Sequence, residues 1–427
     1  MDNIVYPALD ERLYRTRLPN GLTVLVVPKP GFTQKVAYFV TDFGSVHTEF
    51  TLDGQRHSVP AGVAHYLEHK LFELPGRDVS GEFAALGAVV NAFTSYDLTA
   101  YYFSCTDRFD DCLQLLLEFV STPYFPRESV EREQGIIDQE ISMNEDDPNI
   151  RVFENLMAAM YDRHPIRQPI LGTSETIRAI TPQVLTDCHR AFYHPENMLL
   201  CVLGDVDPEA VAAMAQQVLG MPQGAVGEKL PLPREEMVCH TQLVRDRMDV
   251  AMPSFNLGFK CEPLGKGAEA IRQELLADLA CEALFGESSQ LYLDMYGAGI
   301  IDSSFGGGFE TIDGCAMVTC GGDSDHPEQV RDAILRQVAV LLERGIPERD
   351  FLRMKRSSVG RRIRELDSFD STCFRLCAFA MTDFDYFDFP ALYDTLTAAE
   401  VCDFLKRTVH QNNCCLSIIE PIKEETT

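Results

Sequence analysis

The chain has 427 residues, of which 45% are hydrophobic and 24% charged, and its 37 basic against 65 acidic side chains give a net charge of −28. This length predicts two to four domains of roughly 100–200 residues each. The composition is typical of a folded globular protein and excludes a disordered, collagen-like or coiled-coil chain. Nucleic acid and anionic membranes would repel so acidic a surface, so we expect neither as a partner. Metal ions and basic peptides are better candidates.

The amino-terminal segment and the cysteines predict a cytoplasmic protein. Residues 1–17 contain no basic-then-apolar signal segment, and apolar runs such as residues 198–203 are far too short to span a bilayer. The fourteen cysteines lie in apolar patterns and form no C-x-x-C pair. We therefore expect reduced core residues rather than disulfides.

In chain order, apolar periodicity predicts a first half that mixes strands and helices. The predicted strands are 22–27, 35–40, 88–93, 98–104 and 198–203, and the predicted helices are 61–72, 107–121, 127–145, 151–161, 183–191 and 208–219.

The second half repeats that order. Its predicted strands are 250–259, 300–305, 314–321 and 414–419, and its predicted helices are 268–285, 327–343, 348–366 and 398–409. Three glycines at 306–308 fall between two predicted strands and indicate a turn or bulge.

A turn-rich stretch separates the halves, since residues 220–236 hold several glycines and prolines without any period. We predict a zinc-binding catalytic domain at 1–225, a linker at 226–240 and a homologous domain without metal at 241–427. Each would be an α+β domain with a mainly antiparallel sheet and helices packed on one face. The repeated order indicates an ancient duplication; chance similarity of mixed α+β order is the alternative.

The strongest local signal is the H-x-x-E-H sequence His65-Tyr66-Leu67-Glu68-His69 in a helical pattern. Histidines four residues apart lie on one face of a helix, so both imidazoles can reach one cation. Glu68 can border the same site without ligating. Imidazole and carboxylate in this arrangement suit zinc. The alternative is a chance pattern on a core or surface helix.

A catalytic zinc needs a third protein ligand and an open position. The acidic helix at 127–145 is the best supplier, because Glu133 and Glu140 are seven residues apart and therefore share one face. Its apolar side carries Ile136, Ile137 and Ile141. The alternative is a solvated acidic face, which is the commonest fate of a Glu-rich helix.

Four sequence stretches in this order resemble the pitrilysin or insulysin family of inverted zinc peptidases, and in particular its small bacterial members related to mitochondrial processing peptidase. They are GVAHYLEHKLFE, GAVVNAFTS, VEREQGIIDQEI and YHPENMLLCVLGDVD. The resemblance extends over nearly the whole chain.

The resemblance implies a zinc peptidase with assigned roles. His65 and His69 would bind Zn²⁺ with Glu140 as third ligand, Glu68 would be the general base on a zinc-bound water, and Glu133 would assist. Substrate peptide would add as a strand beside Asn91, Ala92 and Phe93; an ordinary strand without a role is the alternative for this segment.

One departure from the family concerns the second half. Many relatives carry there an Arg and, seven residues later, a Tyr that contact substrate, whereas this chain has Tyr296 and Asp302 near those places and no Arg. Either substrate is bound differently or a partner subunit supplies that face. Small family members pair, so we expect a homodimer or a heterodimer with a related subunit.

Three further interpretations remain open. Eight basic residues between Arg344 and Arg364 are best explained as a solvated helix face, with an acidic partner as the alternative. The rival to an enzyme is a non-catalytic subunit that keeps zinc for structure. A narrower rival is a processing peptidase for one peptide.

Overall fold

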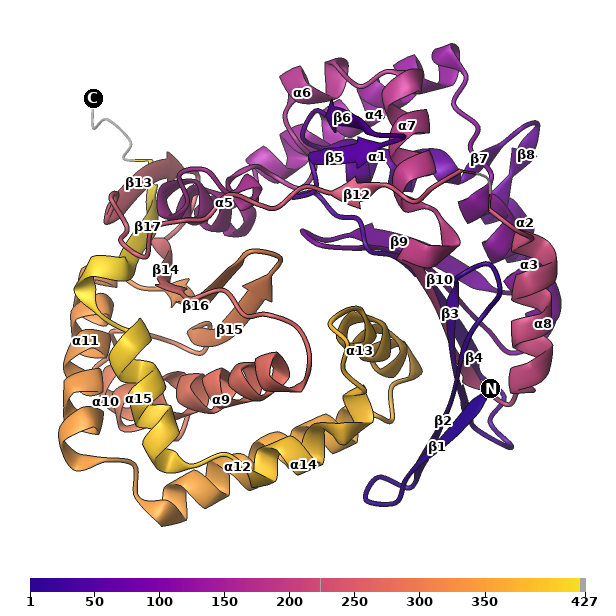
Figure 1. Cartoon of the computed structure of the whole chain (residues 1–427). Helices are drawn as coiled ribbons and strands as arrows, with labels where there is room; N and C mark the ends of the chain where they lie inside the picture. The colour runs from indigo at the N-terminus through magenta and orange to yellow at the C-terminus, as the bar shows by residue number, and fades with distance from the viewer. Residues whose placement is uncertain (223, 423–427) are drawn as a thin grey trace. The chain divides into compact units, whose positions relative to one another are not determined.

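The computed structural model describes residues 1–222 and 224–422, which fold into two compact units (Figure 1). The first unit comprises Met1–Ile141, Pro169–Pro231 and Ile363–Phe389. The second comprises Ser142–Gln168, Leu232–Arg362 and Pro390–Thr427.

These units differ from a single division at 226–240, because the halves exchange one segment each. Helix α5 (Pro148–Met160) packs on β14 and β17 of the second unit, and helix α13 (Phe369–Met381) packs on β4 and β11 of the first. Each helix joins the unit whose sheet covers its apolar side. Turn residues in the sequence mark where a linker lies, but they do not predict that the two halves exchange helices.

The first unit is built on a seven-stranded sheet. Its strands, in spatial order, are β1 (Asp2–Tyr6), β2 (Glu11–Arg17), β3 (Thr23–Pro28), β11 (Met198–Gly204), β4 (Lys35–Thr41), β10 (Thr99–Cys105) and β9 (Val89–Thr94). Only the β3–β11 pair is parallel. Small additional ladders are formed by β5 (Glu49–Leu52) with β6 (Gln55–Ser58) and β12 (Glu228–Lys229), and by β7 (Glu73–Leu74) with β8 (Arg77–Asp78).

Helices cover one face of this sheet and α13 lies against the other (Figure 1). On the first face, alternate strand residues such as Phe39 and Leu200 share a core with Leu116 of α3. β11 is buried along its whole length, as expected for a strand covered on both faces. The helices of the first face and its rim are α1 (Val63–Leu71), α2 (Val79–Ala85), α3 (Phe109–Ser121), α4 (Arg127–Glu145), α6 (Ser174–Arg178), α7 (Pro182–Phe192) and α8 (Pro208–Leu219).

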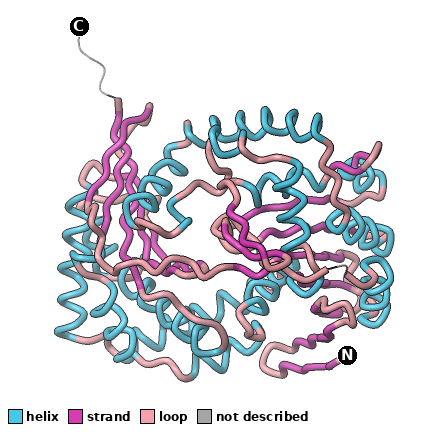
Figure 2. Tube along the Cα trace, turned by 45° about the horizontal axis from the view of Figure 1, so that its top comes forward, coloured by secondary structure: helices cyan, strands magenta, loops and turns pink. Residues whose placement is uncertain are grey.

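The second unit has a five-stranded sheet that repeats the arrangement of five strands of the first sheet. Figure 2 shows the strands in magenta with cyan helices beside them. Its order is β13 (Leu243–Met248), β17 (Cys414–Pro421), β14 (Ser254–Cys261), β16 (Cys315–Asp323) and β15 (Gly306–Ile312). Both sheets contain one parallel pair, β3–β11 in the first and β13–β17 in the second. In each sheet the second strand of that pair comes late in the sequence and then pairs antiparallel with β4 or β14. The repeated order of predicted elements thus corresponds to a repeated sheet. The accompanying helices are α5, α9 (Ala268–Phe285), α10 (Gln290–Gly297), α11 (Pro327–Arg344), most of α12 (Glu348–Glu365), α14 (Phe389–Asp394) and α15 (Ala398–Thr408).

The prediction for the glycine triplet is wrong. Gly306, Gly307 and Gly308 form the start of β15, paired with β16, and the predicted strand at 300–305 is a loop. Glycine is needed here for packing: a Cβ on Gly307 would lie 2.6 Å from the Phe285 ring. Such close approach to a helix overrides the turn preference of glycine.

Two expectations from composition can be compared with the structure. All fourteen cysteines carry free thiols, and all but Cys402 are buried. Among the described residues, no helix combines the length and apolarity needed to cross a bilayer.

Candidate metal centre

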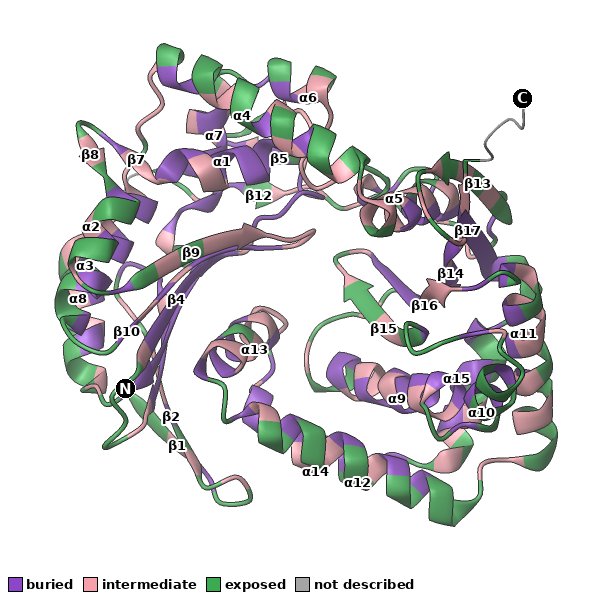
Figure 3. Cartoon of the chain, turned by 180° about the vertical axis from the view of Figure 1, so that it is seen from behind, coloured by how far each residue is buried: buried purple, intermediate pink, exposed green. Residues whose placement is uncertain are grey.

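Helix α1 is largely buried (Figure 3), and it carries His65 and His69. It starts after Gly62, whose φ of 92° is left-handed. A Cβ added at this position would approach the Leu171 carbonyl oxygen to 2.4 Å. Only glycine meets both conditions without strain. The start of the helix, and with it the direction of His65 and His69, is therefore fixed by a close backbone approach.

His65, His69 and Glu140 lie together. His65 Nε2 is 3.7 Å from Glu140 Oε1, and His69 Nε2 is 3.4 Å from Glu140 Oε2. One donor atom from each residue lies within 4.8 Å of the other two, and no other such group of three is found in the described part of the chain. Donor atoms around a tetrahedral zinc ion are roughly 3.4 Å apart, so this set fits zinc.

The two histidines have different surroundings. Burial, together with the positive charge that His69 can carry, lowers the pKa of His65 to about 3, so its imidazole is neutral and free to ligate. Burial alone would also lower the pKa of His69. A hydrogen bond between Glu133 Oε1 and His69 Nδ1, 3.1 Å long, and nearby carboxylates outweigh burial and raise that pKa. Glu133 thus fixes the His69 ring with Nε2 toward Glu140.

Glu68 lies beside the three donors without being one of them. Burial raises its pKa, and the negative charge of Glu140 acts in the same direction. The Thr94 hydroxyl donates a 2.6 Å hydrogen bond to Glu68 Oε2, which favours the charged form and opposes this rise. A carboxylate with a raised pKa next to a metal site is suited to accept and return a proton.

Asn91, Ala92 and Phe93 lie in β9, which is the edge strand of the seven-stranded sheet. Ala92 pairs with Tyr101 of β10 on one side only, so one row of β9 backbone groups lies outside the sheet. The last residue of the same strand, Thr94, forms a hydrogen bond with Glu68. The geometry allows an added peptide strand to end at the metal centre.

Sequence reasoning missed the contact between Thr94 and Glu68. Thr94 directly follows Asn91, Ala92 and Phe93, the residues expected to bind substrate. Its contact with Glu68 joins residues 26 apart on a strand and a helix, and no local spacing predicts such a contact.

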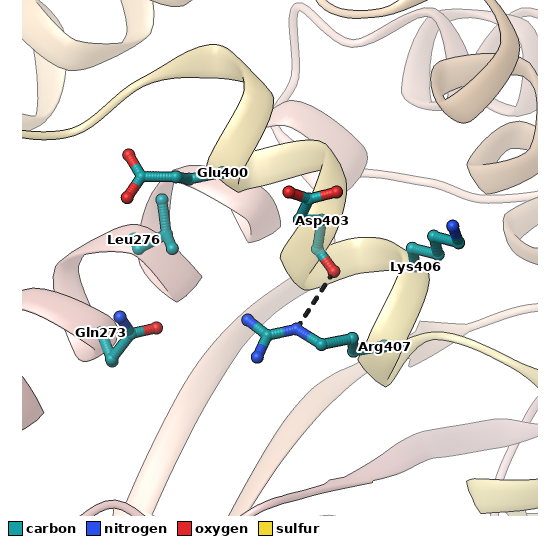
Figure 4. Close-up of a pocket in the computed structure, with 6 residues that line it drawn as sticks. All are labelled: Gln273, Leu276, Glu400, Asp403, Lys406 and Arg407. Atoms are coloured by element: carbon teal, nitrogen blue, oxygen red, sulfur yellow. Dashed lines mark hydrogen bonds between the residues drawn. The ribbon is translucent and has the colours of Figure 1, made fainter.

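The second unit has a hollow of its own, of about 620 Å³, between α9 and α15 (Figure 4). Its polar groups are engaged locally: Arg272 binds Glu400 at 2.5 Å, and Arg407 Nε donates to the Asp403 carbonyl oxygen at 3.3 Å. We assign no chemistry to it. The lining residues are Gln273, Leu276, Glu400, Asp403, Lys406 and Arg407.

The other residues noted in the second half have structural neighbours. Tyr296 stacks on Tyr292 of α10, and the Asp302 carboxylate accepts hydrogen bonds from Ser304. In the basic segment, Arg362 is buried and paired with Asp278 at 2.6 Å, whereas most of its neighbours are exposed. The solvated-face interpretation therefore does not extend to Arg362.

Comparison with known proteins decides the family. Residues 54–174, which contain both histidines, match the family model described as Insulinase (Peptidase family M16), and residues 179–358 match that of the Peptidase M16 inactive domain. The chain is 35% identical to the Bacillus subtilis protein named Uncharacterized zinc protease YmfH, over 98% of this chain and 99% of that protein. The chain belongs to peptidase family M16. The resemblance predicted from four sequence stretches is thereby confirmed.

Solved structures share this fold. The putative M16-like peptidase from Alicyclobacillus acidocaldarius superposes with a TM-score of 0.94 at 33% identity, covering 98% of this chain and all of that one. A protease from Helicobacter pylori shares the fold, with a TM-score of 0.84 at 18% identity over 96% of this chain and 100% of that one. The α+β fold of two similar units is thus that of M16 peptidases.

Proposed function

We propose that this protein is a zinc-dependent metalloendopeptidase that hydrolyses short or unfolded peptides. The observation that carries the proposal is the meeting of His65, His69 and Glu140 beside Glu68, a carboxylate with a raised pKa. M16 membership and the zinc-protease names of its relatives support it.

Under this proposal His65, His69 and Glu140 would hold the ion. Bound zinc lowers the pKa of a coordinated water to about 7 and stabilises negative charge on a carbonyl oxygen. Glu68 takes the proton from the attacking water as the oxygen adds to the peptide carbonyl carbon. Glu68 then gives this proton to the amine nitrogen as the C–N bond breaks. Thr94 holds Glu68 in place, and Glu133 holds His69.

Substrate would bind by strand addition to β9 at Asn91, Ala92 and Phe93. Backbone pairing of this kind tolerates many sequences, because the hydrogen bonds involve no side chains. The net charge of −28 favours basic peptides in the encounter step. The free, mostly buried thiols favour a reducing compartment such as the cytoplasm.

The test is the variant Glu68→Gln. We expect zinc to be retained and peptide cleavage to fall by roughly 10²–10⁴-fold, because the proton acceptor is lost while the ligands remain. The matched control is Glu131→Gln, an exposed glutamate of α4 paired with Arg127, which should retain full activity. Unchanged turnover in Glu68→Gln would show that the base is misassigned.

The alternative is a non-catalytic subunit that keeps zinc for structure. The observation in its favour is that residues 179–358 match the family model of the Peptidase M16 inactive domain. The proximity of Glu68 to the three donors favours the enzyme, because a structural site needs no such group. A dedicated processing peptidase would share the same centre and differ only in substrate range.

We also propose that the protein acts as a homodimer or with a related subunit, since the second half lacks the Arg and Tyr that contact substrate in many relatives. Sedimentation analysis of the purified chain would report its mass. A dimer mass supports the homodimer. A monomer that is inactive alone and active with a related chain supports the heterodimer.

A further inference from the structure

Lys70 is a fully buried lysine that follows directly after the ligand candidate His69. Its side chain is 0% exposed. Its Nζ donates to Glu73 Oε2 of β7 at 2.5 Å and to the Ser129 hydroxyl of α4. Lysine is almost never fully buried without partners, since an isolated buried ammonium is very costly. The surroundings of Lys70 are therefore built for a positive charge.

The same ammonium faces the carboxylate that holds His69. Lys70 Nζ is 4.0 Å from Glu133 Oε2, while Glu133 Oε1 is 3.1 Å from His69 Nδ1. The two oxygens of Glu133 are thus divided between a cation and an imidazole. The Glu133 side chain is 14% exposed, so water does little to stabilise its charge, and Lys70 is the positive group beside it.

The position of Lys70 also limits its repulsion of a metal ion. Glu73 pairs with the Lys70 ammonium at 2.5 Å and offsets its charge. Burial raises the pKa of Glu73, but the hydrogen bonds from Lys70 and Ser129 together with the charges of Lys70 and Arg132 lower it overall. The second carboxylate beside the Lys70 ammonium is that of Glu133, at 4.0 Å, and Lys70 attracts it from one direction.

We propose that Lys70 is a positioning residue of the metal centre: its buried ammonium holds Glu133 in the orientation that fixes His69, and thereby strengthens zinc binding. The inference rests on the proposed zinc site and deepens it. Orienting partners outside the ligand shell typically change metal affinity 10–100-fold.

The experiment measures zinc affinity of the full-length protein by competition with a chromophoric chelator, without any peptide. We expect Glu133→Gln to weaken zinc binding roughly 10–100-fold and Lys70→Met to weaken it roughly tenfold. In the double variant Lys70→Met/Glu133→Gln the loss should equal that of Glu133→Gln alone, because Lys70 acts through Glu133.

A second readout separates positioning from mere packing. In zinc-loaded protein the His69 Nδ1 proton that bonds to Glu133 should give a distinct imidazole N–H resonance, and Lys70→Met should shift or broaden it. The matched control is Lys260→Met in the second unit, since Lys260 is 2% exposed and 3.5 Å from Glu235. This control should lower stability without changing zinc affinity or the resonance.

Each outcome decides the proposal. Zinc affinity that is unchanged or higher in Lys70→Met, or a loss that adds to that of Glu133→Gln, would overturn it. Should Lys70→Met not fold, Lys70→Met/Glu73→Gln removes both members of the ion pair and takes its place, since replacing both partners costs less than orphaning one. Failure of the wild type to bind zinc would instead overturn the proposed function.

Discussion

At the scale of single residues, side chains of the same type in the candidate metal centre differ in their properties because their surroundings differ. His65 is kept neutral by burial, His69 is oriented by Glu133, and Glu68 is left beside them with a raised pKa. We propose three roles for the three glutamates of this site: Glu140 as metal ligand, Glu133 as support of His69 and Glu68 as general base. Differences of this kind are typical of catalytic sites.

Thr94→Val tests the support of Glu68. The Thr94 hydrogen bond lowers the pKa of Glu68, so its removal raises that pKa. The base must be ionised to act, and the acidic limb of the pH–rate profile should therefore move to higher pH. Thr94→Ser keeps the hydroxyl and should leave the limb in place. An identical acidic limb in Thr94→Val and wild type would contradict this role.

The positions of His65, Glu68 and His69 could be predicted because their spacing is a local property of one helix. The spacing of Glu133 and Glu140 points to their helix as a supplier of ligands, but taken alone it favours a solvated acidic face. The choice of Glu140 as third ligand came from the resemblance. Thr94 and Lys70 could not be predicted, because their roles depend on how β9 and α4 pack against α1. Tertiary contacts of this kind leave no periodic signal.

At the scale of elements, long periodic helices follow from sequence better than strands do. Helices α4, α8 and α9 have the predicted limits, because each is a long run with apolar residues at helical spacing. Strand β13, with alternating exposure and the charged sequence LVRDRM, was not predicted. Its strand conformation comes from pairing with β17, which lies far along the chain.

The glycines of β15 allow a matched test of the packing argument. Gly307→Ala would place a methyl group 2.6 Å from Phe285 and 2.7 Å from the Cys320 Cβ, whereas a Cβ on Gly306 meets nothing within 4 Å. We expect Gly307→Ala to lower the free energy of unfolding by about 1–3 kcal/mol through overpacking. Gly306→Ala should be close to neutral. Denaturant midpoints check this, and equal midpoints for the two variants would contradict the packing role.

At the scale of the whole molecule, each unit is completed by a helix from the other half of the sequence. α5 packs on the sheet of the second unit and α13 on that of the first. Neither half of the sequence therefore contains every helix that packs on its sheet. We expect a fragment produced by cutting the chain at 226–240 to fold poorly for this reason. The repeated sheet topology was predictable from element order, but the exchange was not.

The net charge predicts how salt affects substrate capture. Electrostatic steering of a basic peptide is screened as the Debye length falls from about 30 Å at 0.01 M to about 8 Å at 0.15 M ionic strength. We expect kcat/KM for a Lys-rich peptide to decrease several-fold over this range with kcat little changed. A neutral peptide of the same length is the control. A basic peptide unaffected by salt would exclude steering.

The central claim is that this chain cleaves peptides with a metal ion held by His65, His69 and Glu140. The most direct measurement is incubation of the purified protein with a mixed peptide library, with and without a chelator, followed by mass spectrometry. We predict internal cleavage products that disappear with chelator and return on addition of stoichiometric zinc, but never return in Glu140→Gln. Products that persist with chelator, or a zinc-loaded protein that yields none either alone or together with a related chain, would contradict the account.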